Sequence, residues 1–132
     1  MDSVVALHHA RREHEIVAAL SFDYGAKHND REIPFAKWHA DHLGIPHITV
    51  PLAFIGEQFE SDLLQKGGEI PKGHYEEETM KETVVPNRNK IFASIVQAVA
   101  LSVVKDTGEE TAIALGIHAG DHAVYPDCRQ EF

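Results

Sequence analysis

Short apolar runs that alternate with helical patterns constrain the fold of this chain more than any other feature. The runs at 16–22, 47–50 and 111–115 have the length and the Ile, Val and Leu content of strands buried in a parallel sheet. Amphipathic segments precede and separate them, and we predict helices over 4–15, 29–43 and 89–105. This order predicts an α/β fold whose right-handed crossovers build a doubly wound parallel sheet.

Polar residues at the ends of the predicted helices indicate where each one starts and stops. Asp2 or Ser3 can cap the first helix, and Asn29 or Asp30 can cap the second. Gly44 is a plausible left-handed terminator of the second helix. Pro34 conflicts with a start at Asp30, because proline removes a backbone hydrogen bond, and this favours a regular helix that begins only at Pro34.

The middle of the chain predicts loops rather than further strands. We expect a short helix around 59–64 within a loop that follows the second strand. Segment 66–82 holds three glycines, a proline and an acidic run, which favours a mobile surface loop over a lid. The helix over 89–105 should pack on the sheet through one apolar face, formed by Ile91, Phe92, Ile95, Val96, Val99 and Val103.

Composition restricts the class of protein. A length of 132 residues fits one domain. A net charge of -9, from 21 acidic against 12 basic residues, disfavours a protein that binds a phosphate backbone. A single cysteine excludes an internal disulfide framework and predicts a reducing compartment. Because the apolar runs are far shorter than the roughly 20 residues of a membrane span, we expect a soluble, cytoplasmic protein without nucleic-acid or membrane partners.

Chemically diverse side chains follow the predicted strands, and this is where parallel sheets bind ligands. The last strand runs through Gly116 into a loop that ends near Arg129, and this loop predicts a pocket wall. Segment 23–28 places an acid, a phenol, a glycine, a lysine and a histidine after the first strand. Arg88, with the free N–H groups of the third helix, can hold an anion, although Asn87 or Asn89 capping that helix is the alternative.

Two further patterns leave alternatives open. His118, Asp121 and His122 could bind a metal ion, as could His39 and His42, but inert histidines are the simpler interpretation of the helix pair. A neighbouring cation could lower the pKa of Cys128 and make it a nucleophile, whereas a packing role explains this residue equally well.

Three segments, 21–25 (SFDYG), 85–89 (VPNRN) and 125–132 (YPDCRQEF), together resemble the 7-cyano-7-deazaguanine synthase family of ATP pyrophosphatases, the PP-loop superfamily. The resemblance implies an adenine nucleotide alpha hydrolase type of sheet, which is Rossmann-like and here incomplete. The family opens with a strand and a glycine-rich loop, and Met1 to Ser3 match the end of that loop. We expect 1–132 to be a single nucleotide-binding α/β domain that lacks this opening and the family's zinc-binding cysteines, and to be inactive by itself.

The activity that this resemblance implies is an ATP-dependent ligation in queuosine biosynthesis. The family converts 7-carboxy-7-deazaguanine and ammonia into the nitrile, using ATP with Mg²⁺ to activate first the carboxylate and then the amide. The implied partners are these small molecules, and zinc belongs to the full-length family, with no ligands in this chain. The protein's own task would be positioning and charge stabilisation.

The resemblance also assigns candidate roles by position. The catalytic candidates, which would hold the reacting groups, the pyrophosphate or the edge of the base, are Arg88, Asp121, Asp127 and Arg129. Those implied for ATP are Asp2, Ser3, Val4, Phe22 and Asp23. Those implied for the deazaguanine are Tyr24, His28, Asn89, Gly116, Tyr125 and Cys128. No metal ligand is expected in this chain.

Two other functions compete with this one. Another amidating or nucleoside-thiolating PP-loop enzyme would share the sheet, although the YPDCR segment argues against it. A non-catalytic interaction module is the alternative from a different class. Because a missing strand would leave backbone groups and apolar faces exposed, we also expect a homo-oligomer.

Overall fold

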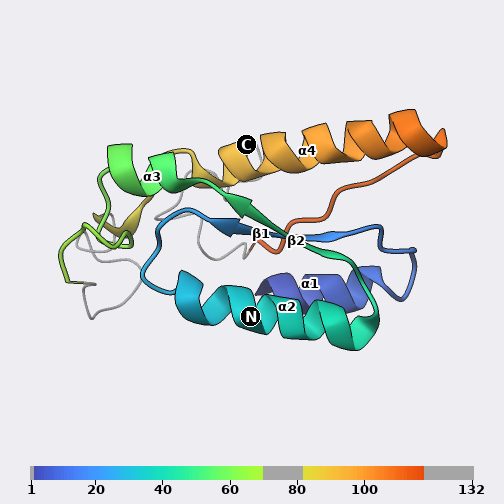
Figure 1. The fold of residues 1–132 in the computed structure, drawn as a ribbon, viewed down its shortest axis with the longest axis horizontal. Helices are drawn as coiled ribbons and strands as arrows, with labels where there is room; N and C mark the ends of the chain where they lie inside the picture. Colours follow the sequence, from blue (N-terminus) through green and yellow to red (C-terminus); the bar gives the residue numbers. More distant parts are fainter. Residues whose placement is uncertain (1, 70–81, 118–132) are drawn as a thin grey trace.

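A parallel pair of strands forms the centre of the computed structural model, which describes residues 2–69 and 82–117 (Figure 1). Strand β1 (Ala19–Asp23) pairs with β2 (His47–Pro51), in a register that places Ala19 opposite His47 and Asp23 opposite Pro51. Helix α2 (Asn29–Leu43) connects the two strands. Both strands are within a few residues of the predicted ranges, although β1 begins at Ala19 rather than at Ile16.

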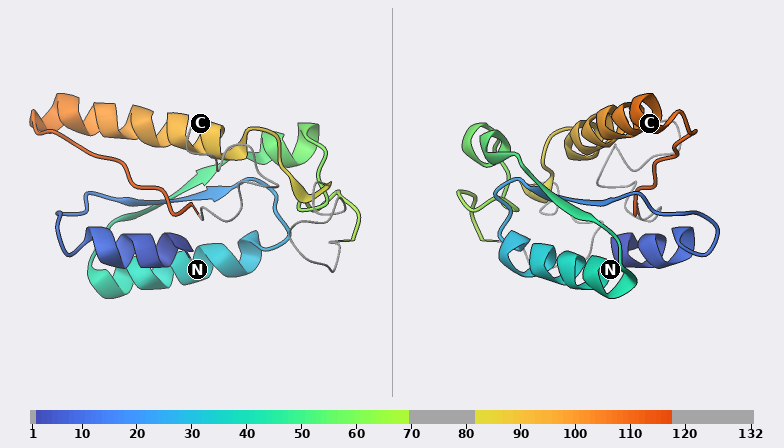
Figure 2. Two further views of the ribbon diagram at one scale, coloured as in Figure 1. Left: turned by 180° about the vertical axis from the view of Figure 1, so that it is seen from behind. Right: turned by 45° about the vertical axis from the view of Figure 1, so that its right-hand side comes forward.

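Helices cover both faces of this sheet (Figure 2). Helices α1 (Asp2–Ala10) and α2 lie on one face, and α3 (Ala53–Gln58) and α4 (Arg88–Thr107) lie on the other. This layering, with the parallel β1–α2–β2 unit, confirms the prediction of an incomplete, Rossmann-like α/β fold. Of the described helices, none is both long and apolar enough to cross a membrane.

The core lies between the sheet and the α3 and α4 layer. Its buried side chains are Tyr24, Ala26, Leu52, Ile55, Leu64 and Val85. Ile91, Phe92 and Ile95 of α4 pack against this cluster, which confirms for those three residues the predicted apolar face. The core therefore joins the carboxyl ends of the strands to the first turns of α4.

The helix ends agree with the sequence at one position and disagree at others. Gly44 ends α2 with φ of 69°, in the left-handed conformation predicted for it. Helix α2 begins at Asn29, so Pro34 lies inside it, and the start proposed at Pro34 is wrong. His28 precedes α2 and makes no side-chain cap bond, and the Asn29 side chain bonds the end of β1 instead of capping the helix. The N-terminus of α4 has no side-chain cap bond either.

Two predicted elements are corrected by the structure. The short helix expected at 59–64 occurs earlier, as α3, because the fully buried Ile55 anchors residues 53–58 against the core. The predicted third strand, 111–115, is not a strand. Neither β1 nor β2 pairs with it, and an extended segment without a hydrogen-bonded neighbour among the described residues does not make a sheet.

Candidate functional site

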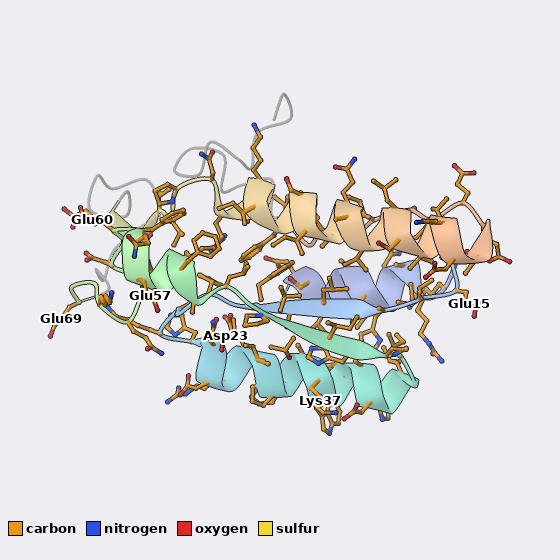
Figure 3. All side chains as sticks on the ribbon, turned by 45° about the horizontal axis from the view of Figure 1, so that its top comes forward. Glu15, Asp23, Lys37, Glu57, Glu60 and Glu69 are labelled. Atoms are coloured by element: carbon orange, nitrogen blue, oxygen red, sulfur yellow. The ribbon has the colours of Figure 1, made fainter. Side chains whose placement is uncertain are left out.

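Asp23 is the last residue of β1 and points toward the start of α2 (Figure 3). Its Oδ1 accepts a hydrogen bond from Asn29 Nδ2 at 2.9 Å, and the same amide nitrogen lies 3.5 Å from the Phe22 carbonyl oxygen. Asn29 is buried, whereas Asp23 remains exposed. The carboxylate is thus oriented by the protein and is still accessible to a ligand at the carboxyl edge of the sheet.

Phe22 and Tyr24 lie on the opposite face of β1, as the period of two along a strand requires. Both contact Phe92 of α4: the Phe22 ring stacks on it with centroids 4.1 Å apart, and Tyr24 meets it edge-on at 5.3 Å. Tyr24 is buried. The strand end therefore separates the candidates, because the two rings pack under α4 whereas Asp23 faces α2.

The turn after β1 is held by a close backbone contact. Gly25 has φ of 78°, and a Cβ on it would lie 3.1 Å from the Gly56 Cα atom in α3. A Cβ on Gly56 would in turn lie 3.2 Å from the Tyr24 carbonyl oxygen. Glycine at both positions lets α3 approach the turn, which fixes where Tyr24 and His28 leave the sheet.

Lys27 has a role that the sequence did not reveal. Its Nζ donates to the carbonyl oxygens of Asp62 at 2.7 Å, of Gly67 at 3.3 Å and of Gly68. The sequence placed this cation at a strand end but gave no indication of these acceptors, because they lie 35 or more residues away.

Arg88 is the first residue of α4, and its Nε donates to Asn89 Oδ1 at 3.2 Å. Asn87 precedes it with φ of 52°, in the left-handed region, and makes no side-chain cap bond, so the capping alternative is wrong for Asn87. Phe92 follows one turn later and contacts β1. The structure thus brings the start of α4, with Arg88 and Asn89, to the end of β1 that carries Phe22 and Tyr24.

Asp2, Ser3 and Val4 form the first turn of α1, and Asp2 is its acidic residue. A Cβ on Gly116 would come within 2.5 Å of the Ser3 N and Cα atoms. Although 111–117 is not a strand, its end is therefore packed directly on this helix terminus. Ser3 and Gly116, predicted for ATP and for the deazaguanine respectively, are neighbours.

The remaining predictions lie outside the described residues. They are the catalytic candidates Asp121, Asp127 and Arg129, the substrate candidates Tyr125 and Cys128, and the metal alternative at His118 and His122. His28 precedes α2 and is exposed at the same edge as Asp23.

Histidines elsewhere contact aromatic rings. On α2, His42 stacks on Trp38 with centroids 5.4 Å apart, and His39 meets both Trp38 and His8 of α1. Within 2–69 and 82–117, no three His, Cys, Asp or Glu side chains gather in a way that could hold a metal ion. Asp23 and Lys27, the charged residues at the end of β1, instead form hydrogen bonds within the protein.

Comparison of the sequence with known proteins identifies a family. The family model for queuosine biosynthesis protein QueC matches residues 1–132. A 7-cyano-7-deazaguanine synthase from Porphyromonas gingivalis is 52% identical over all 132 residues, which cover 57% of that relative. Proteins of the same name from Desulfotalea psychrophila and Brucella ovis are 50% and 45% identical, with 58% and 54% of their lengths covered.

The chain therefore spans a little over half the length of the curated relatives that it matches. No solved structure matches it. The match to the family covers every residue, including the three segments that carry the resemblance and the strand ends described above. This chain belongs to the queuosine biosynthesis protein QueC family.

Proposed function

We propose that this protein takes part in the ATP-dependent conversion of 7-carboxy-7-deazaguanine and ammonia into 7-cyano-7-deazaguanine. The observation that carries the proposal is the match of the whole chain to the family, together with 52% identity to a relative named 7-cyano-7-deazaguanine synthase. The other PP-loop activities and the non-catalytic module are not favoured by these relatives, all of which are named 7-cyano-7-deazaguanine synthase.

The first turn of α1 carries groups of the kinds that hold the phosphate end of ATP with Mg²⁺. Its exposed Asp2 carboxylate is an oxygen ligand of the kind that Mg²⁺ takes, and unpaired N–H groups at a helix start attract phosphate. Ser3 is close enough to Gly116 that no side chain fits between their backbones. When bound, ATP would supply the adenylyl group that activates the substrate oxygen, with Asp2, Ser3 and Val4 holding its phosphates and metal.

The end of β1 supports the remaining roles. Phe22 and Asp23 would line the adenine side, and Asn29 orients the Asp23 carboxylate for that purpose. Arg88 would pair with the substrate carboxylate or the pyrophosphate, since a guanidinium group binds either in a bidentate manner. We assign the deazaguanine to Tyr24, His28, Asn89 and Gly116, together with Tyr125 and Cys128. We assign contact with the reacting groups to Arg88, Asp121, Asp127 and Arg129.

An assay of the protein as it occurs in the cell tests this proposal. Carboxydeazaguanine, ammonium and MgATP should yield the nitrile, AMP and pyrophosphate, detected by mass spectrometry. Arg88→Ala should lower turnover by about 100-fold or more, as the loss of one charge-stabilising donor does. Lys105→Ala, near the far end of the same helix, is the matched control and should leave turnover unchanged. Wild-type rates for Arg88→Ala would remove Arg88 from the site.

The proposal includes self-association in the cytoplasm. Large apolar side chains are exposed on several elements, among them Phe35 at 68% and Leu101 at 62%, and contact with a second copy would remove such apolar area from water. Sedimentation velocity should show a species larger than the monomer, and a monomer at every concentration would contradict this part of the proposal.

A further inference from the structure

Lys27 is the one lysine or arginine in the turn after β1, and its contacts argue against a role in ligand binding. An ammonium group has three N–H donors, and three backbone oxygens accept from it, those of Asp62, Gly67 and Gly68. We call these three oxygens the carbonyl cage. The side chain is partly buried, and its hydrogen-bonding capacity is used within the protein.

The carbonyl cage is built by a loop that closes tightly on itself. A Cβ on Gly67 would lie 2.1 Å from the Ser61 carbonyl oxygen, so this position accepts only glycine. The Gly68 N–H donates to Asp62 Oδ1 at 2.7 Å, and the Gly67 N–H donates to the Leu64 carbonyl oxygen at 2.9 Å. The contacts within loop 61–68 thus orient its carbonyl groups independently of the Lys27 ammonium group.

Backbone hydrogen bonds join this loop to the turn that carries the candidate substrate residues. The Lys27 N–H donates to the Leu63 carbonyl oxygen at 3.0 Å, and the Gln65 N–H donates to the Gly25 carbonyl oxygen at 2.9 Å. Ala26 and Leu64 form an antiparallel bridge between these bonds. The Lys27 side chain reaches beyond this short ladder and ties its end to the loop.

We propose that Lys27 is a positioning residue, whose ammonium group fills the carbonyl cage and so holds the 24–28 turn, with Tyr24 and His28, against loop 61–68. The functional part of this statement rests on the proposed function, whereas the structural part does not. The competing role, in which Lys27 binds a substrate carboxylate or phosphate directly, would require its N–H donors to leave the three carbonyl groups.

Arginine distinguishes the two roles. A guanidinium group binds carboxylate and phosphate as well as lysine does, but its planar fork does not match three converging carbonyl oxygens. If Lys27 is a positioning residue, Lys27→Arg should resemble Lys27→Ala. If Lys27 binds an anionic ligand, Lys27→Arg should resemble the wild type.

Amide hydrogen exchange of Gln65, followed by NMR, tests the structural part on this chain. Lys27→Ala and Lys27→Arg should each speed exchange of this amide by about tenfold, the loss expected when hydrogen bonds of this strength are removed. Added methylammonium should restore protection in Lys27→Ala, because it presents an N–H₃⁺ group to the empty cage. Tetramethylammonium, a cation of the same charge without N–H donors, should not.

Lys66→Ala is the matched control, because this exposed lysine of the same loop contacts a single carbonyl oxygen, that of Glu57 at 3.2 Å. It should leave Gln65 exchange unchanged. Wild-type protection in Lys27→Ala or Lys27→Arg would overturn the proposal, and so would equal rescue by tetramethylammonium. If Lys27→Ala does not fold, Gly67→Ala should show the same loss of Gln65 protection with Lys27 present. Wild-type protection in Gly67→Ala would overturn the proposal that Lys27 fills the carbonyl cage.

Steady-state kinetics on the protein as it occurs in the cell test the functional part. Lys27→Arg should raise the KM for carboxydeazaguanine by several-fold more than it lowers kcat, because the turn that holds Tyr24 and His28 is displaced. A KM unchanged in Lys27→Arg would overturn this part. If the wild type itself makes no nitrile, the proposed function fails, whereas the exchange result for Gln65 still decides whether Lys27 fills the cage.

Discussion

Asn29 shows how a buried polar residue can serve a strand rather than the helix that it begins. The sequence predicts a helix cap at this position, because asparagine at a helix start accepts from free N–H groups. In the structure the side chain turns back and donates to Asp23 and to the Phe22 carbonyl oxygen. The sequence alone could not favour this second use, since it depends on where β1 ends relative to α2.

We predict that Asn29→Ala lowers the free energy of unfolding by about 1–2 kcal/mol, because it removes a buried side chain together with its hydrogen bonds to Asp23 and to the Phe22 carbonyl oxygen. Urea denaturation measures this loss. Asp30→Ala, at an exposed position one residue later, is the control and should change stability by less than about 0.5 kcal/mol. Equal effects in the two variants would show that Asn29 contributes only helix propensity.

The surroundings of His47 predict that the stability of the fold depends on pH. Burial lowers its pKa from the ordinary value of 6.5, and the positive charge of Lys37 lowers it further, against the opposing effect of Asp41. The neutral ring, whose Nε2 lies 2.9 Å from Ser21 Oγ, is therefore favoured in the folded state. The unfolded chain then binds more protons, so this stabilisation is complete above pH 6.5 and is lost as the pH falls through the lower, folded-state pKa.

His47→Gln should remove this component and flatten the fall in stability on the acid side. Urea unfolding of wild type and variant, repeated from about pH 8 down to about pH 5, gives the difference. His42→Gln, on an exposed ring of α2, controls for the loss of any histidine. A difference between wild type and His47→Gln that stays constant with pH would contradict the assigned pKa direction.

At the scale of single elements, the sequence correctly predicted the helix whose residue pattern and end are local features. The α2 helix and its glycine terminator followed from periodicity and from the preference of glycine for positive φ. The predicted strand at 111–115 failed because a strand also needs a neighbour, and no described strand lies beside it. The helix expected at 59–64 failed because burial of Ile55 is a tertiary property.

Two glycines with similar positive φ separate backbone strain from packing. Gly25→Ala and Gly44→Ala both place a side chain in the left-handed region, at a cost of about 1–2 kcal/mol. A Cβ on Gly44 has no neighbour within 4 Å, whereas one on Gly25 lies 3.1 Å from the Gly56 Cα atom. Gly25→Ala should therefore destabilise the protein more than Gly44→Ala in thermal unfolding. Equal losses would mean that α3 moves freely away from the turn.

At the scale of the whole molecule, the sequence predicted that β1, β2, α2 and α4 meet at one end of the sheet, but not on which face of the sheet the neighbouring residues lie. In Figure 1 the strands end and helices α2 and α4 begin toward the same side, as the alternating pattern implied. Only the structure separates Asp23, facing α2, from Phe22 and Tyr24 under α4. The hydrogen bonds of Lys27 to the carbonyl oxygens of loop 61–68 have no local signal in the sequence.

Phe92 joins the two layers, because this α4 side chain contacts both Phe22 of β1 and Tyr24, the residue that follows the strand. Phe92→Ala should destabilise the fold by about 3 kcal/mol, the lower end for a core phenylalanine, since the ring is only partly buried. Leu101→Ala, on an exposed turn of the same helix, should cost less than about 0.5 kcal/mol. If urea denaturation gave both variants the same small loss, α4 would not depend on this contact, and the approach of Arg88 to the end of β1 would need another cause.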